Sequence, residues 1–126
     1  MRFGVVILTM GTRPAELAAG IASVLAQRDV ETDVVVVGNG WDPIDLPAGV
    51  RGLHLPENIG IPAGRNAGAR AVKGDLLFFL DDDARLPDEH FLASVARLMA
   101  EHPEFGLVQP RVVDPSGTPA PGRWVP

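Results

Sequence analysis

Three long apolar runs constrain the fold of this chain most strongly. They are residues 3–10 (FGVVILTM), 33–37 (DVVVV) and 75–80 (DLLFFL), and most of their side chains are branched aliphatic or aromatic. A strand with one face in water would alternate apolar and polar residues. These continuous runs therefore indicate strands buried on both faces of a parallel sheet. Residues 50–55 (VRGLHL) indicate a further short strand.

Segments with helical periodicity separate these runs. Residues 13–28, 60–73 and 87–102 place apolar or small side chains three or four positions apart, which predicts three helices. Pro14 is tolerated in the first turn of the first helix, and residues 87–89 (PDE) are expected in the first turn of the last one.

A final strand is expected at residues 105–113 (FGLVQPRVV). Pro110 has no N–H to donate, so this strand should lie at an edge of the sheet or contain a bulge. Within the second predicted helix, Gly64 and Gly68 each cost about 1 kcal/mol of helix stability. Two such residues indicate that another backbone or a ligand approaches the helix closely.

The alternation of strands and helices predicts an α/β fold, with a mostly parallel sheet in a three-layer α/β/α sandwich. Ligands bind such sheets outside the carboxyl ends of the strands, as in Rossmann-like nucleotide-binding domains. Residues 9–13, 38–41 and 81–83 follow three of the predicted strands. We therefore expect these loops to meet at one edge of the sheet.

Three adjacent aspartates, Asp81 to Asp83, follow the last of the long apolar runs. Two carboxylates about 5 Å apart repel by about 1 kcal/mol in water and by several-fold more where solvent is excluded, so a positive charge is expected nearby. In an extended chain Asp81 and Asp83 would point to one side, with Cα atoms about 6.6 Å apart. That arrangement would allow both to bind one divalent ion. Hard oxygen ligands favour Mg²⁺ or Mn²⁺ over Zn²⁺. The simpler interpretation is a polar turn in which one aspartate caps the next helix.

Composition narrows the classes of function. A chain of 126 residues is expected to form one domain with a single core. The net charge is −5 and the basic residues are scattered, which argues against general nucleic-acid binding. No apolar run approaches the roughly 20 residues that span a bilayer, and the first apolar run is expected to be a strand and not a signal peptide. With no cysteine in the chain, a reducing cytoplasm is the simplest location. An association with the inner face of the membrane would need segments outside this chain.

Residues 113–126 contain several prolines and glycines and predict neither a helix nor an interior strand. The domain is therefore expected to end near residue 112, with residues 113–126 as a tail that leads toward a further part of the protein.

The order of the motifs resembles a known family. VVILTMGTRP with SVLAQ, VVVVGNG, ENIGIPAGRNAG and GDLLFFLDDDARLPDEHFL together resemble the nucleotide-binding half of family 2 glycosyltransferases, which have the GT-A fold. The resemblance covers about residues 3–112. The pattern N-x-G-x-x-x-x-R-N-x-G, followed by aspartates after an apolar strand, is specific in combination, whereas D-x-D alone is not.

The resemblance implies a metal-dependent, inverting transfer of a sugar from a nucleoside-diphosphate sugar to an acceptor hydroxyl, of the hexosyltransferase type. Asp83, with Asp81, is implied to hold Mn²⁺ or Mg²⁺ against the diphosphate. The acceptor is open and could be a glycan, a lipid or a small molecule. The residues expected at the nucleotide-sugar are Thr9, Arg13, Gly38, Asn39, Asn58, Arg65, Asn66, Asp81 and Asp82.

The sequence departs from the family pattern in two places. Gly38 stands where the family usually has an aspartate near the base, which leaves the base open and makes Trp41 a candidate for stacking. Family members also usually continue for about as many residues again, which supply the acceptor site and a catalytic base. Glu104 and Asp114 are available carboxylates, but nothing in the sequence assigns either as the base. The chain is therefore expected to resemble the donor half of an enzyme, which by itself binds nucleotide without turnover.

Two other functions fit parts of the sequence. The loop TMGTRP has some similarity to the glycine-rich loop of sugar-phosphate nucleotidyltransferases, although it has only one glycine. A nucleotide-binding module without catalytic activity is the other alternative.

Overall fold

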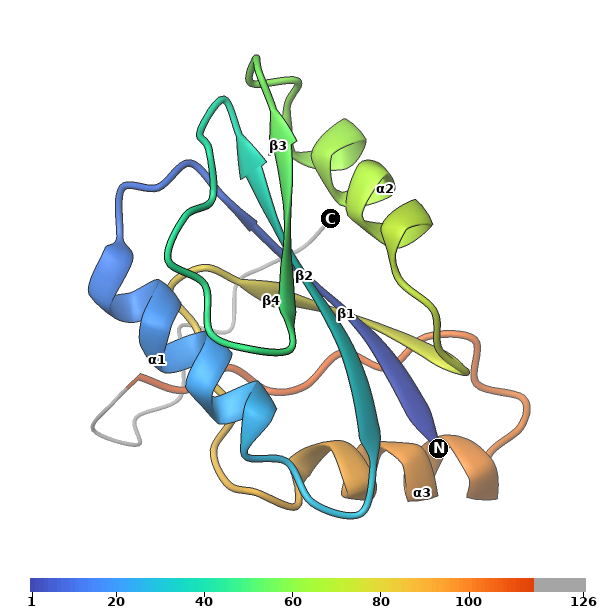
Figure 1. Cartoon of the computed structure of the whole chain (residues 1–126). Helices are drawn as coiled ribbons and strands as arrows, with labels where there is room; N and C mark the ends of the chain where they lie inside the picture. The colour runs from blue at the N-terminus through green and yellow to red at the C-terminus, as the bar shows by residue number, and fades with distance from the viewer. Residues whose placement is uncertain (115–126) are drawn as a thin grey trace.

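The computed structural model describes residues 1–114, and residues 115–126 of the predicted tail lie outside the described residues. Strands and helices alternate as the sequence predicted (Figure 1). The elements are, in chain order, β1 (Arg2–Thr9), α1 (Pro14–Leu25), β2 (Glu31–Asn39), β3 (Val50–Leu55), α2 (Ile61–Ala71), β4 (Leu76–Asp81) and α3 (Phe91–Glu101).

The four strands form one sheet in the order β3-β2-β1-β4, and all neighbouring strands are parallel. The first strand in the sequence therefore lies inside the sheet, between β2 and β4. Its register pairs Leu8 with Val37 on one side and with Asp81 on the other. This register brings the carboxyl ends of β1, β2 and β4 to one edge.

Helices cover both faces of the sheet, which confirms the predicted three-layer α/β/α arrangement. α1 and α3 lie on one side and α2 on the other (Figure 1). Alternate residues of β1 divide between the two layers, since Phe3, Val5 and Ile7 pack with residues of α1 and α3, and Val6 and Leu8 pack in the other layer. Burial on both faces explains why the strand is continuously apolar.

The glycines of α2 make the predicted close approach, but to side chains of the sheet and not to another backbone or a ligand. Gly64 and Gly68 are the buried residues of this helix. A Cβ atom on Gly64 would lie 2.7 Å from Leu8 Cδ1, and one on Gly68 would clash with Val6 and Val37. The two glycines therefore set the distance between α2 and the sheet.

Two predictions about the C-terminal part are wrong. Residues 105–113 form no strand apart from an isolated bridge at Val113. Pro110 removes a donor from this segment, and Leu107 is 86% exposed and so does not pack against the sheet. The last helix begins at Phe91, and residues 87–89 precede it.

Apolar side chains remain exposed on β4, one of the two outer strands of the described sheet. Leu77 and Phe79 are 47% and 41% exposed, because they point to the α2 side of the sheet while α2 packs chiefly against β1 and β2.

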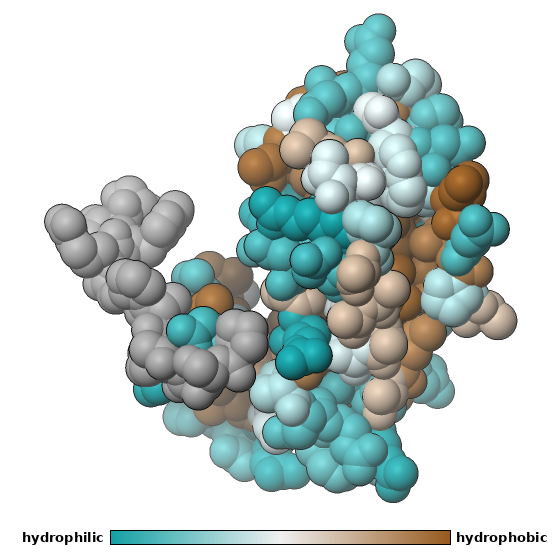
Figure 2. All heavy atoms as spheres, turned by 90° about the vertical axis from the view of Figure 1, so that its left-hand side faces the viewer, coloured by the Kyte–Doolittle hydropathy of each residue, from teal (hydrophilic) through white to brown (hydrophobic). Residues whose placement is uncertain are grey.

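The face that bears α1 is mostly hydrophilic, with hydrophobic residues gathered along one edge (Figure 2). In residues 1–114, none of the helices has the length and apolar character needed to cross a bilayer.

Candidate functional site

The carboxyl ends of β1 and β4 meet through a hydrogen bond between Thr9 and Asp82. The register pairs Leu8 with Asp81, so the next residues, Thr9 and Asp82, are also side by side. The Thr9 hydroxyl donates to Asp82 Oδ2 at 2.9 Å and accepts from the Gly11 N–H at 3.0 Å. Thr9 is only 2% exposed. Thr9 thus joins the loop after β1 to the aspartates as a buried link.

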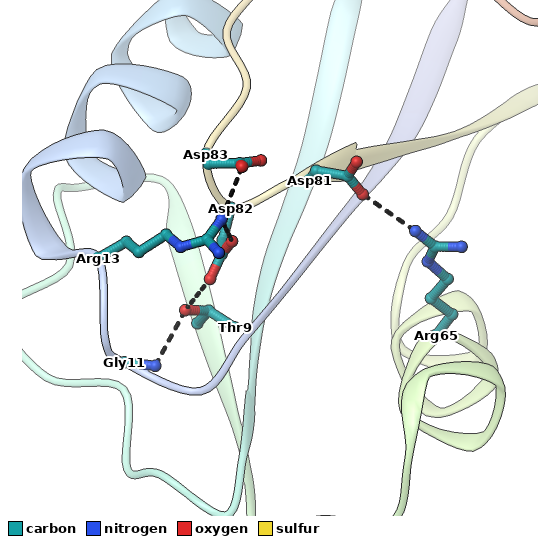
Figure 3. Close-up of polar contacts among 7 residues, drawn as sticks. All are labelled: Thr9, Gly11, Arg13, Arg65, Asp81, Asp82 and Asp83. Carbon is teal, nitrogen blue, oxygen red and sulfur yellow. Dashed lines mark hydrogen bonds and ion pairs between the residues drawn. The ribbon is translucent and has the colours of Figure 1, made fainter. Parts of the chain in front are cut away.

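The aspartates lie in a turn and not in an extended segment. β4 ends at Asp81, and the Ala84 N–H donates to the Asp81 carbonyl at 3.1 Å. The extended geometry from which the sequence placed Asp81 and Asp83 on one side is therefore wrong. The three carboxylates have different partners: Asp82 contacts Thr9, Asp83 contacts Arg13, and Asp81 contacts Arg65 (Figure 3).

Two arginines supply the positive charge that the sequence led us to expect. Arg13, just before α1, places its NH1 atom 2.6 Å from Asp83 Oδ2 and 3.7 Å from Asp82 Oδ1. Arg65, on α2, places NH2 3.0 Å from Asp81 Oδ1. The two arginines approach the aspartates from different elements, Arg13 from the residue before α1 and Arg65 from α2 (Figure 3). Asp82 and Asp83 are therefore the two carboxylates that share one cation.

Arg65 has a second contact at the surface. Its guanidinium lies 5.8 Å from the centre of the Phe79 ring, within the range of a cation–π interaction. Phe79 and Asp81 are two residues apart on β4 and so point to the same side of the strand. This pair holds Arg65 over the end of β4, on the α2 side of the sheet.

Residues of α1 and of the loop after it position the turn that follows the aspartates and the start of α3. The Ser23 hydroxyl accepts from the Leu86 N–H at 3.0 Å, and Gln27 accepts from the Leu92 N–H at 2.9 Å. Gly20 lets the Ala84 carbonyl approach, since a Cβ atom there would lie 2.6 Å from that oxygen. Sequence reasoning assigned no role to these three residues, although Ser23 and Gln27 are the ends of the SVLAQ motif.

Asn39 and Asn58 shape the loop that leads into α2. Asn39 is 4% exposed; it donates to the Gly60 carbonyl at 3.1 Å and accepts from the Ile59 N–H at 2.9 Å. Asn58 accepts from the Gly60 N–H at 2.9 Å, so its amide shapes this loop, and its contact with a nucleotide-sugar stays a prediction. Asn66, in contrast, lies within α2 and is exposed. Because both ends of the Asn39 amide are bonded to backbone, this residue positions the loop.

The end of β2 has no room for a side chain at position 38. A Cβ atom on Gly38 would clash with the carbonyl oxygen of Trp41 and lie 2.8 Å from Pro43 Cδ. The Trp41 ring packs against Gly11, where a Cβ atom would be 2.5 Å from three ring atoms. Gly11 has a φ of +78°, which also favours glycine. The departure from the family pattern at Gly38 is thus built into the local backbone.

The donor set suits Mg²⁺ or Mn²⁺ in kind, because Mg²⁺ sites commonly combine one or two carboxylates with substrate phosphates. Within residues 1–114, no group of three or more acidic or histidine side chains is arranged to hold a metal. The geometry groups Asp82 with Asp83, whereas the assignment of Asp81 and Asp83 to one metal stays a prediction.

Comparison with known proteins identifies the family. The model of "Glycosyl transferase family 2" matches residues 5–124, which is nearly the whole chain. The chain belongs to this family. None of the curated proteins compared with it matches.

Solved structures of the protein TarS share the fold. TarS 1-349 from S. aureus has a TM-score of 0.65 at 22% identity and covers 81% of this chain. The same fragment in complex with UDP-GlcNAc has a TM-score of 0.61 at 20% identity, again over 81% of this chain. These matches confirm the predicted GT-A fold. The chain spans only 33% and 32% of the two TarS fragments.

No catalytic base emerges from the described residues. Glu104 lies in the exposed turn after α3, where its Oε1 is 3.1 Å from His102 Nδ1. Asp114 is the last residue that the structure describes. The contact of Glu104 lies within its own turn and does not involve the aspartates. The domain boundary at residue 112 also stays a prediction, and the family match continues beyond it to residue 124.

Proposed function

We propose that this chain is the donor-binding part of a family 2 glycosyltransferase, and that it binds a nucleoside-diphosphate sugar at the carboxyl ends of β1 and β4. The observation that carries the proposal is the meeting of three aspartates and two arginines from separate parts of the sequence at that edge. Ligands of open α/β sheets bind at this edge. Membership of the family supports the same placement.

The positive side chains would bind the diphosphate. Arg13 and Arg65 are 52% and 42% exposed, so ligand can reach both guanidinium groups. Arginine forms two parallel hydrogen bonds to phosphate oxygens, which orients the ligand as well as attracting it. Thr9 would act through Asp82, because its hydroxyl is buried and already bonded to that carboxylate.

A Mn²⁺ or Mg²⁺ ion at the aspartates would neutralise the charge that develops on the departing nucleoside diphosphate. Asp83 is the carboxylate best placed to hold it, since its side chain is 51% exposed and the turn presents it at the surface. Asp82 lies beside it but is only 18% exposed. Asp81 and Arg65 would lie on the α2 side of the bound donor.

The sugar would pass to an acceptor hydroxyl with inversion at the anomeric carbon, and a carboxylate outside the described residues would remove the acceptor proton. The acceptor could be a glycan, a lipid or a small molecule. UDP and UDP-GlcNAc are reasonable first ligands, because crystals of TarS contain them. Gly38 stands where the family usually has an aspartate near the base, so nucleotides with a base other than uracil are equally worth testing.

The test is calorimetric titration of the full chain with UDP, GDP, dTDP and CDP, each with Mn²⁺ and again with EDTA. We expect one nucleotide to bind in the presence of the metal and to bind at least tenfold more weakly without it. The Arg28→Gln variant should bind nucleotide as the wild type does, because Arg28 forms a surface ion pair with Glu89 at the other end of α1, away from the aspartates. A folded chain that binds none of the four nucleotides would contradict the proposal. Release of pyrophosphate from a nucleoside triphosphate and sugar phosphate would instead favour the nucleotidyltransferase alternative.

A further inference from the structure

Arg13 occupies the point at which Asp82 and Asp83 converge. One nitrogen of its guanidinium lies 2.6 Å from Asp83 and 3.7 Å from Asp82. The Arg13 backbone is held in place, since its carbonyl accepts from the Leu17 N–H at 2.9 Å and Pro14 follows it in the first turn of α1. Only the side chain is free to move, and it is half exposed.

We propose that Arg13 is a built-in counterion of these two carboxylates, which keeps divalent metal affinity low until a diphosphate draws the arginine away. This inference rests on the proposed function and adds to it a regulation of the same site. It predicts that metal and nucleotide bind with strong mutual assistance, part of which comes from Arg13.

The guanidinium and a metal ion cannot occupy this position together. A Mg²⁺ ion binds carboxylate oxygens at about 2.0–2.1 Å, and the Arg13 nitrogen is already in hydrogen-bond contact with Asp83 Oδ2. Both partners are positive, so a metal ion at these oxygens would also repel the arginine. The metal must therefore displace the side chain or bind in a poorer geometry.

A diphosphate gives Arg13 an alternative partner. Exposed ion pairs are weak, so the contact between Arg13 and Asp83 can be exchanged at little cost. Phosphate oxygens accept two parallel hydrogen bonds from a guanidinium. Movement of Arg13 from the carboxylates to the diphosphate would free both aspartates while retaining a charged contact with the ligand.

Arg65 provides a comparison within the same site. It contacts Asp81 and lies over Phe79, and it has no observed contact with Asp82 or Asp83. Its removal would take away a positive charge near the aspartates without freeing the pair that Arg13 joins. The two arginines can therefore be separated by mutation.

The experiment is titration of the full chain with Mn²⁺ alone, followed by electron paramagnetic resonance of the free ion. The variants are Arg13→Gln, Arg13→Lys, Arg65→Gln and the distant control Arg28→Gln. We expect Arg13→Gln to bind Mn²⁺ about three- to tenfold more tightly than the wild type, a gain of up to about 1.4 kcal/mol. Arg13→Lys should gain less, because it keeps the charge, and Arg28→Gln should not change. A variant that merely disturbed the site would lose affinity, so the sign of the effect is diagnostic.

The proposal is overturned if Arg13→Gln binds Mn²⁺ no more tightly than the wild type, or if Arg65→Gln or Arg28→Gln gains as much. A second titration adds a saturating nucleoside diphosphate chosen from the calorimetry. The gain in Mn²⁺ affinity that the nucleotide produces should be smaller in Arg13→Gln than in the wild type, and an equal gain would also overturn the proposal. If no nucleotide binds the wild type, the proposed function fails and so does the role of the diphosphate. An unchanged Arg13→Gln together with nucleotide binding removes only the counterion.

Discussion

Replacement of Gly68 by alanine should destabilise the protein, even though alanine is the better helix former. Gly68 faces the sheet from α2, and a Cβ atom there would clash with Val6 Cγ1 and lie 2.8 Å from Val37 Cγ2. Val6 and Val37 are 1% and 0% exposed, and valine has little freedom to change rotamer. The added methyl group can be accommodated only if α2 moves outward.

Two opposing effects set the magnitude. Alanine stabilises a helix interior by up to about 1 kcal/mol relative to glycine. Inserting a methyl group into a packed core costs about 1–3 kcal/mol, and two buried neighbours place this case toward the upper end. The net loss should be about 1–2 kcal/mol in the free energy of unfolding. For a domain of this size that corresponds to a fall of about 3–10 °C in Tm.

Thermal and urea unfolding of the variant, followed by circular dichroism, provide the assay. Gly106→Ala is the matched control, since a Cβ atom there has nothing within 4 Å and the change should be neutral or slightly stabilising. Arg65 lies one turn before Gly68, so an outward shift of α2 should also weaken nucleotide binding. A Gly68→Ala protein that unfolds cooperatively at or above the wild-type Tm would show that the space between α2 and the sheet accommodates a methyl group, and would refute the packing argument.

Three further predictions concern charged residues. Asp83→Asn should abolish metal-dependent nucleotide binding with little loss of fold stability, because its side chain is half exposed; calorimetry that gives an unchanged metal-dependent affinity in a folded variant would contradict the assignment. Arg65→Ala should weaken nucleotide binding by about 1–3 kcal/mol if a charged hydrogen bond to the ligand is lost, whereas an unchanged dissociation constant would make Arg65 structural. Burial raises the pKa of Asp33, but hydrogen bonds from the Lys73 N–H and the Arg51 guanidinium outweigh it, so the pKa is lowered overall from its ordinary value of 3.8. The ionised Asp33 thus stabilises the fold above pH 3.8, and this stabilisation is lost as the pH falls through the lower pKa that Asp33 has in the folded protein. The difference in the free energy of unfolding by urea between wild type and Asp33→Asn should therefore shrink over that pH range. A difference that does not depend on pH would contradict this linkage.

The position of Asp33 explains why this prediction is separate from the site. Asp33 accepts from Arg51 and from the Lys73 N–H, each at 2.8 Å, and Arg51 also donates to the Ala71 carbonyl. These contacts join the start of β2 to β3 and to the end of α2. They lie near the amino ends of the strands, whereas the aspartates lie at the carboxyl ends, so Asp33→Asn should leave nucleotide binding unchanged.

Local patterns in the sequence were sufficient for the elements and the fold class. Strands β1, β2 and β4 have continuous apolar runs because they are buried on both faces, and consecutive apolar residues can be recognised in the sequence of each strand. The periodicity of α1 and its Pro14 likewise report one buried side and one helix start. The expected strand at residues 105–113 failed because Leu107 faces solvent and only Val113 forms a bridge, and the sequence pattern alone does not reveal which apolar residues find a partner.

The geometry of the site depended on contacts between distant residues. Thr9 and Asp82 are 73 positions apart, and they bond only because β1 lies beside β4 in a register that pairs Leu8 with Asp81. The sequence predicted that aspartates would gather with positive charge at a sheet edge, which is correct.

Which aspartate pairs with which arginine was decided by the tertiary structure. The turn after Asp81 ends the strand alternation, and α1 holds the segment that follows through Ser23 and through the close approach of Gly20 to the Ala84 carbonyl. As a result Asp82 and Asp83 share Arg13, while Asp81 faces Arg65. By itself the sequence determined the residue types at the sheet edge, because strand ends and burial are local properties. Side-chain direction in a turn follows from backbone dihedrals and packing against α1, and these exist only in the folded chain.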